Sequence, residues 1–138
     1  MTPEEIRAAI SGDQAILALV PDTTAIASAL SDGRTRIEKR NGGIGLIIET
    51  LGPDVGSQVL DSIDALRASN NAVKWAWYLL ERGDLDFGSA ATRGMIQLLF
   101  AESPPVRDAL LAVAEVPDPV SEFEVRKAIF SDSGEVLV

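Results

Sequence analysis

Apolar residues recur along most of the chain at the three- and four-residue intervals that place side chains on one face of an α-helix. One clear stripe runs through Val55, Val59, Ile63 and Leu66, and aspartates between these positions turn to the opposite face. Segments with helical spacing lie at residues 3–10, 14–20, 23–30, 54–68, 73–81, 90–102, 104–113 and 122–129. The pattern predicts a mainly α protein, a compact bundle of about seven to eight short helices in a single helical domain over residues 1–138.

Capping residues mark the starts of the first and last of these helices. Thr2 with Glu5, and Ser121 with Glu124, have the spacing of a capping box, in which two side chains and two backbone amides satisfy each other. Pro3 suits the first turn of a helix, because the amide proton that proline lacks would have no partner there. Both helix starts are therefore predicted at the level of single residues.

Two segments depart from helical spacing. Residues 34–40 alternate between charged and less polar side chains, which is the two-residue period of a strand, and residues 134–138 form a short apolar tail. Each segment follows a helix, a Ser-Asp turn and a glycine. This similarity indicates either a duplicated unit or, as we favour, the common use of serine, aspartate and glycine at helix ends. We expect the two segments to pair as a small two-stranded β element, about 34–39 with 134–138.

Glycines complicate the prediction for residues 44–51. This segment is apolar enough for a buried helix, but Gly42, Gly43 and Gly45 leave a strand open. A phosphate-binding loop would need a preceding strand, a defined spacing and usually a lysine followed by serine or threonine. Those features are missing, so we interpret the glycines as a flexible hinge or as a site of close backbone packing.

Aromatic residues gather in the helix predicted at 73–81, where Trp75, Trp77 and Tyr78 lie among leucines and a valine. Because apolar residues surround most of this helix, we expect it to be central in the core, with its aromatic side chains buried. The alternative is that they line a ligand pocket.

Composition excludes several classes of chemistry. The chain has no cysteine and no histidine, so it has no disulfide, no thiolate nucleophile, no zinc site of the usual kind and no Ser-His-Asp triad. The formal net charge of −9 disfavours binding to nucleic-acid backbones and favours solubility and basic partners. We expect a protein that is not an enzyme and that uses no cofactor, no metal and no small-molecule substrate.

Two acidic motifs are candidate sites. Asp84 and Asp86 could hold a divalent cation, but two carboxylates are too few and no calcium-loop spacing follows. The triplet Asp86-Phe87-Gly88 matches a kinase element, yet no phosphate loop or catalytic loop accompanies it. We interpret Phe87 as a hydrophobic staple before a helix that begins near Ser89.

The most distinctive charge feature is a basic cluster formed by Arg34, Arg36, Lys39 and Arg40 in an otherwise acidic chain. It is a candidate contact for a protein partner, together with the apolar Leu137–Val138 end, which could add to the sheet of a neighbour. The alternatives are a solvated edge strand and ion pairs with acidic residues of the same chain. Nucleic acid is disfavoured as a partner because no aromatic residue interleaves the cluster.

The sequence also bears on localisation. No apolar run approaches the roughly 20 residues that span a bilayer, and Glu4 and Glu5 stand where a signal peptide would carry positive charge. We therefore expect a soluble chain without a signal peptide and without a membrane contact.

Several short blocks resemble a group of small proteins of unassigned function that are encoded in tailed-bacteriophage genomes. The blocks are Ile26-Ala27-Ser28-Ala29-Leu30-Ser31-Asp32-Gly33-Arg34-Thr35, Glu49-Thr50-Leu51-Gly52-Pro53, Leu85-Asp86-Phe87-Gly88-Ser89, Thr92-Arg93-Gly94-Met95 and Val116-Pro117-Asp118-Pro119-Val120. They are scattered over most of the chain, and none of them is a mechanistic motif. The resemblance implies a phage origin, and with it a location in a virion or in a host cytoplasm, but it implies nothing about catalysis.

Tailed-phage proteins of this size are often minor virion components, assembly factors or inhibitors of host systems. We therefore expect a structural or assembly protein, such as a head or tail accessory component, that acts through protein partners or self-association. The alternative is an acidic phage-encoded inhibitor or regulator that occupies a basic surface on a host protein.

Overall fold

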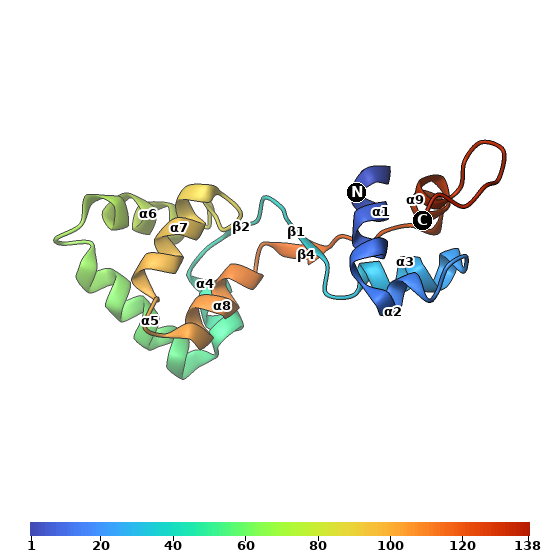
Figure 1. Ribbon diagram of the computed structural model, residues 1–138. Helices are drawn as coiled ribbons and strands as arrows, with labels where there is room; N and C mark the ends of the chain where they lie inside the picture. The colour runs from blue at the N-terminus through green and yellow to red at the C-terminus, as the bar shows by residue number, and fades with distance from the viewer. The chain divides into compact units, whose positions relative to one another are not determined.

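The computed structural model describes all residues from Met1 to Val138 and is mainly helical (Figure 1). Its helices are α1 (Pro3–Gly12), α2 (Gln14–Leu17), α3 (Thr23–Ser31), α4 (Ile44–Leu51), α5 (Pro53–Leu66), α6 (Asn71–Glu81), α7 (Ala90–Leu99), α8 (Pro104–Ala112) and α9 (Glu122–Ile129). Its strands are β1 (Thr35–Ile37), β2 (Asn41–Gly42), β3 (Leu85–Asp86) and β4 (Glu115–Pro117). The predicted fold class is confirmed, with nine helices instead of seven to eight.

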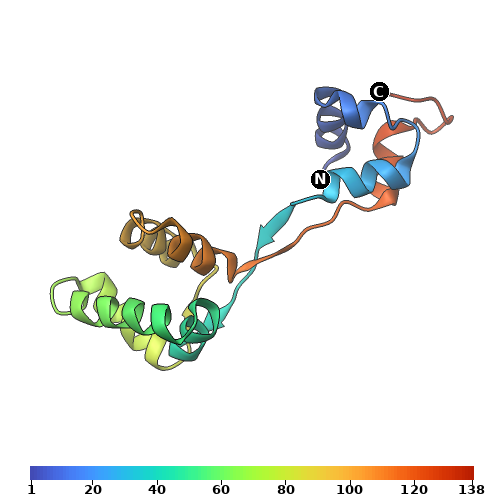
Figure 2. The same cartoon turned by 90° about the horizontal axis from the view of Figure 1, so that it is seen from below.

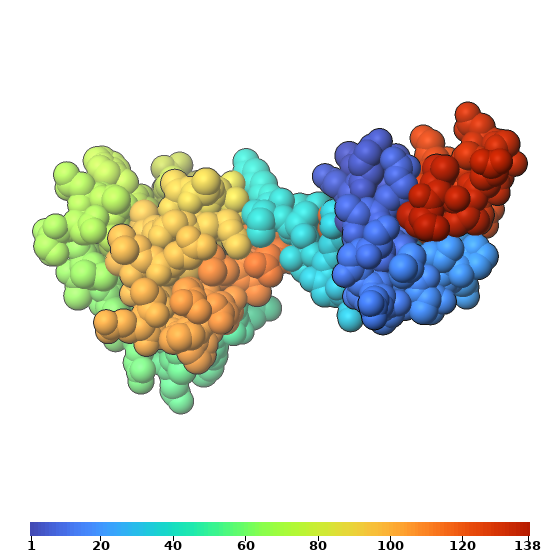
Figure 3. All heavy atoms as spheres, in the orientation of Figure 1, coloured from blue at the N-terminus to red at the C-terminus, as the bar shows by residue number.

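The chain divides into two compact units. The first unit contains Met1–Arg36 together with Pro117–Val138, and the second unit contains the intervening Ile37–Val116. Each unit has a hydrophobic cluster of its own. In Figure 3 the two chain ends, dark blue and red, lie together in the first unit. Helical spacing shows which side of a helix is apolar but not which helices share a core, and the single domain stays a prediction.

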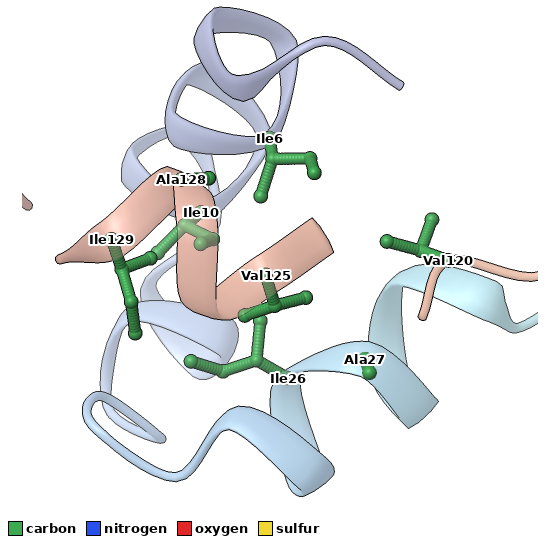
Figure 4. Close-up of a cluster of buried hydrophobic side chains, with 8 residues drawn as sticks. All are labelled: Ile6, Ile10, Ile26, Ala27, Val120, Val125, Ala128 and Ile129. Carbon is green, nitrogen blue, oxygen red and sulfur yellow. The ribbon is translucent and has the colours of Figure 1, made fainter. Parts of the chain in front are cut away.

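The first unit joins the two ends of the sequence. Its core brings together side chains from α1, α3 and α9, which converge in Figure 4. The buried residues are Ile6, Ile10, Ile26, Ala27, Val120, Val125, Ala128 and Ile129. Polar contacts close the edges of this core. Arg7 donates from Nη1 to the carbonyl of Ala128 at 3.1 Å, and the N-terminal ammonium lies 3.5 Å from the carboxylate of Glu124.

The second unit surrounds a larger aromatic and aliphatic cluster. It contains α4 to α8, coloured from green to orange in Figures 1 and 2. The buried residues are Ile47, Val59, Trp77, Leu80, Phe87, Ile96, Leu110 and Ala114. Phe87 is almost completely buried there, so it contributes to the core of the unit and does more than a staple at the start of α7 would.

The small β elements differ in pairing from the prediction. A strand does form at Thr35–Ile37, but it pairs with β4 and not with residues 134–138. The C-terminal tail instead turns back on the end of α9, where Phe130 and Val136 form an antiparallel bridge and the amide of Leu137 donates to the carbonyl of Ile129 at 2.7 Å. The turn at Gly134 brings Val136 back to Phe130, and closing so short a loop costs little conformational entropy.

A second two-stranded element, β2 with β3, holds the glycine-rich segment in place. The segment after it is helical, as α4, so the strand alternative for residues 44–51 is wrong. A Cβ on Gly43 would lie 2.9 Å from the carbonyl oxygen of Leu80 and 3.0 Å from Cα of Gly83. Close backbone packing is therefore the reason for glycine at this position.

Both predicted capping boxes are present. The hydroxyls of Thr2 and Ser121 each accept a hydrogen bond from the amide three residues later, and the glutamates at those positions accept one in return. The helices at the two ends of the sequence thus begin where the local sequence predicts.

Glu122 connects α9 to α3. Its Oε1 accepts hydrogen bonds from the hydroxyl of Thr23 at 2.9 Å and from Nη2 of Arg126 at 2.8 Å. Hydrogen bonds from Thr23 and Thr24, aided by the charge of Arg126, lower the pKa of Glu122 below its ordinary value despite some desolvation. Ionised Glu122 therefore stabilises the folded state of the first unit.

Substitution of Glu122 should change how stability depends on pH. Because its pKa is lower in the folded state, its contribution is complete above the ordinary glutamate pKa of about 4.3 and is lost as the pH falls through the folded-state value. We expect Glu122→Gln to lower Tm at pH 7 and to make the loss of Tm between about pH 5 and pH 3 shallower than in the wild type. Thermal melts followed by circular dichroism would measure both. The control Glu135→Gln should follow the wild-type curve of Tm against pH. A Glu122→Gln variant that also follows this curve would contradict the prediction.

Gly88 should be intolerant of any side chain. A Cβ there would overlap the carbonyl oxygen of Glu38 and lie 2.8 Å from its carbonyl carbon. We expect Gly88→Ala to destabilise the protein by about 1–3 kcal/mol in urea unfolding. Gly94→Ala is the matched control, because the position is helical and has nothing within 4 Å. It should stabilise by about 0.5–1 kcal/mol. Equal effects of the two substitutions would contradict this assignment.

Candidate interaction surfaces

The basic cluster is divided between the two units. Arg34 and Arg36 belong to the first unit and meet at Asp118, with nitrogen–oxygen distances of 3.1 and 3.6 Å. Arg36 also donates to the carbonyl of Pro117 at 3.2 Å. The ion-pair alternative raised for this cluster therefore describes two of its four residues.

Lys39 and Arg40 belong to the second unit. The backbone of Arg40 is held by β3 and the residue after it: its amide donates to Oδ1 of Asp86 at 3.0 Å, and its carbonyl accepts from the amide of Phe87 at 2.9 Å. The side chains of Lys39 and Arg40 are exposed and form no ion pair. Partner binding by the four basic residues stays a prediction.

The C-terminal end is only half available to a partner. Leu137 exposes 49% of its surface, whereas Val138 packs against the core of the first unit. The backbone of Leu137 already bonds to Ile129. Strand addition to a neighbour, which we predicted for this end, would have to use the edge that faces away from α9.

The acidic pair Asp84 and Asp86 has structural partners. Oδ1 of Asp86 accepts from the amide of Arg40 at 3.0 Å and from that of Gly88 at 2.9 Å, which fixes the turn between β3 and α7. Asp84 lies 3.5 Å from the guanidinium of Arg82. No three histidine, cysteine or carboxylate side chains come together as metal ligands would.

Helix α6 has two different apolar faces. Val73, Trp77 and Leu80 point into the core of the second unit. The expectation that all three aromatic residues are buried is wrong, because Trp75 is 62% exposed and Tyr78 is 40% exposed. The spacing of four and three residues from 73 to 77 to 80 selects one face for the core and leaves the other outside.

The outward side of this helix, which we call the α6 outer face, consists of Lys74, Trp75, Tyr78, Leu79, Glu81 and Arg82. The rings of Trp75 and Tyr78 are tilted by 59° with centroids 5.5 Å apart, and Nζ of Lys74 lies 5.4 Å from the centroid of Trp75. A shallow hollow of about 430 Å³ on this face is lined by Trp75, Tyr78, Leu79, Glu81 and Arg82. Exposed tryptophan, tyrosine and arginine are the residue types that most often dominate protein–protein binding energy.

A second surface feature is a groove along α5, which we call the α5 groove. One wall consists of Val55, Gln58, Val59, Ser62, Ile63 and Leu66, and the other consists of Leu99, Phe100, Ser103 and Val106. The groove has a volume of about 310 Å³, and none of its lining residues is charged. Helix α5 itself carries Asp54, Asp61 and Asp64 and no basic residue.

Sequence reasoning missed both features because it assigned every apolar residue of a stripe to the core. In α6 the apolar residues surround most of the helix, whereas packing against a core buries only one side of it. This width could have indicated that some of them are exposed. For α5 the signal was that Val55 and Leu66 lie at the ends of the stripe, where neighbouring helices cover them least; both are exposed.

In the first unit the largest exposed aromatic residue is Phe123 on α9, which is 70% exposed. Nζ of Lys127 lies 5.9 Å from its ring centroid. The pair of Phe123 and Lys127 is thus similar to the pair of Trp75 and Lys74, in which a lysine lies over an exposed aromatic ring. Phe123 therefore provides a matched comparison for substitutions on α6.

The two tryptophans should behave oppositely on truncation. Trp77→Ala removes a core side chain and the hydrogen bond that its Nε1 donates to Glu81 at 2.8 Å, so we expect a loss of about 3–5 kcal/mol in urea unfolding. Trp75→Ala should change stability by no more than about 0.5 kcal/mol. Acrylamide should quench Trp75 far more strongly, measured in single-tryptophan variants. Similar quenching of both would contradict the orientation of α6.

No helix of the structure combines the length and the apolar character needed to cross a membrane. Comparisons of the chain with protein-family models, with curated proteins and with solved structures give no match.

Proposed function

We propose that this chain is a structural or assembly protein of a bacteriophage particle, a head or tail accessory component that acts through protein–protein contacts. The observation that carries the proposal is the α6 outer face, where Trp75, Tyr78 and Leu79 are exposed side by side on one helix. Large apolar side chains gathered in this way gain free energy when a partner covers them.

The chemistry of the chain supports contact as its mode of action. It has neither histidine nor cysteine. The carboxylate of Asp84 pairs with a guanidinium, and that of Asp86 accepts hydrogen bonds from backbone amides. The proposal therefore assigns no catalytic residue, metal or cofactor. The phage part of the proposal is supported by the resemblance of the scattered sequence blocks.

A second candidate function is an acidic inhibitor or regulator that occupies a basic surface of a host protein. The observation that favours it is helix α5, on which Asp54 and Asp61 form no ion pair, whereas Asp64 pairs with Arg67 at the end of the helix. Binding of that kind would weaken steeply with added salt, whereas binding through the aromatic α6 outer face would change little.

Mass spectrometry of purified phage particles tests the proposed function. We expect the chain at a fixed stoichiometry in wild-type particles or in an assembly intermediate. Trp75→Glu should reduce its incorporation at least about tenfold by removing a central contact. Phe123→Ala, which truncates an exposed aromatic residue on the first unit, is the control and should be incorporated normally. Absence of the chain from both particles and intermediates would refute the structural role.

A further inference from the structure

The two units differ in how the chain supplies them, because one is continuous in sequence and the other is not. We propose that the second unit acts as a folding switch for the first. The first unit is folded only while the second unit is folded, whereas the second unit needs no residue of the first. The proposal concerns the chain alone and does not depend on the proposed function.

The core of the first unit cannot form from one segment of the chain. Four of its eight buried apolar residues come from residues 1–36 and four from residues 117–138, and they meet in one cluster (Figure 4). Helix α9, from the later segment, packs against both α1 and α3 from the earlier one. Residues 1–36 alone therefore leave Ile6, Ile10 and Ile26 without the α9 side chains that bury them.

Hydrogen bonds inside the first unit also join the two segments. Oγ of Ser31 accepts from the amide of Val120 at 2.9 Å, and the hydroxyl of Thr23 donates to Glu122 at 2.9 Å. Arg7 contributes the bond to the carbonyl of Ala128. Each of these contacts exists only when the two segments are close together.

The second unit, in contrast, is complete in itself. It is the continuous segment Ile37–Val116, and all of its buried core residues lie within that segment. Helices α4 and α8, which lie toward its two ends in sequence, pack against each other. The hydrogen bond between Glu38 and Ala114 holds together the points where the chain enters and leaves the unit. Folding of the second unit thus brings the two segments of the first unit within reach of each other.

Chain entropy makes the first unit dependent on this closure. When the second unit is unfolded, a flexible loop of about 80 residues joins the two segments. The probability that the ends of such a loop meet falls as the three-halves power of its length, which for this loop is a factor of roughly 700. A unit of about 60 residues has a small core and little stability to set against such a factor.

The dependence also sets an order of events during synthesis. Residues 1–36 leave the ribosome first, but they acquire their core only after residues 117–138 have been made and the second unit has folded. A partner that recognises the first unit therefore meets only chains whose second unit is intact.

Matched buried-charge substitutions in the full chain test the proposal. Leu110→Asp places a carboxylate in the core of the second unit, and Val125→Asp does the same in the first; both leucine and valine are almost completely buried. Peptide-resolved hydrogen exchange follows both units. Tryptophan emission follows the second unit alone, because both tryptophans lie on α6.

The two variants should behave differently. We expect Leu110→Asp to unfold the second unit and to lower the protection of the slowest-exchanging amides in α1 and α9 at least about hundredfold. Val125→Asp should unfold the first unit and leave the native tryptophan emission. Leu98→Asp, at a second-unit position that is 79% exposed, is the control and should leave both units folded. A folded first unit beside an unfolded second unit, or loss of the second unit in Val125→Asp, would overturn the proposal.

Urea unfolding of the wild type gives a test that needs no substitution. The protection of α1 and α9 should be lost at the same urea concentration as the native tryptophan emission or at a lower one. A first unit that stays protected after the tryptophan signal has reached its unfolded value would contradict the dependence.

A covalent bridge should replace the folded second unit. The amide of Asp118 donates to the carbonyl of Arg34 at 3.0 Å, and Cα atoms of strand neighbours joined in this way lie roughly 5.5 Å apart, within the reach of a disulfide. The chain has no cysteine, so Arg34→Cys with Asp118→Cys allows only this bridge.

This bridge is to be tested in the Leu110→Asp background, where the second unit is unfolded. Oxidation should restore the protection of α1 and α9 without restoring the native tryptophan emission, and reduction should abolish it again. A first unit that stays unfolded when bridged would overturn the proposal, because loop closure would then not be what the second unit supplies.

Discussion

Everything in the first unit depends on bringing the two ends of the sequence together. Ile6 and Ile10 on α1 share one core with Ile26 on α3, and that core is completed by Val125 and Ile129 on α9, at the other end of the sequence. The cost of closing such a long loop grows slowly with its length, and it falls if the loop is itself folded. The second unit is that folded loop.

Backbone hydrogen bonds show how the loop is closed. Within the second unit the amide of Glu38 donates to the carbonyl of Ala114 at 2.9 Å. This hydrogen bond joins the segment that enters the second unit to the segment that leaves it. Within the first unit the amide of Asp118 donates to the carbonyl of Arg34 at 3.0 Å, and its carboxylate holds Arg34 and Arg36. Arg34 and Arg36, two of the four residues of the basic cluster, thus hold the chain segment that carries Asp118.

The second unit leaves several large apolar side chains exposed. Burying Val73, Trp77 and Leu80 is enough to seat α6 on the core, so Trp75, Tyr78 and Leu79 are left at the surface. Because these three side chains stay in water, the isolated chain lacks the stabilisation that their burial would give. A protein that works by contact can recover that free energy when a partner covers them, which connects the packing of one helix with the proposed function.

Local sequence determined much of this protein. Capping boxes at Thr2 and Ser121 and the spacing within α5 locate helices because their causes lie within a few residues. Only the tertiary structure decided the partner of β1, the division into two cores and the exposed side of α6. Each of these depends on which distant segments compete for the same apolar surface, as when residues 134–138 fold onto the end of α9 and leave β1 to pair with β4. The periodicity of one helix carries no information about that competition.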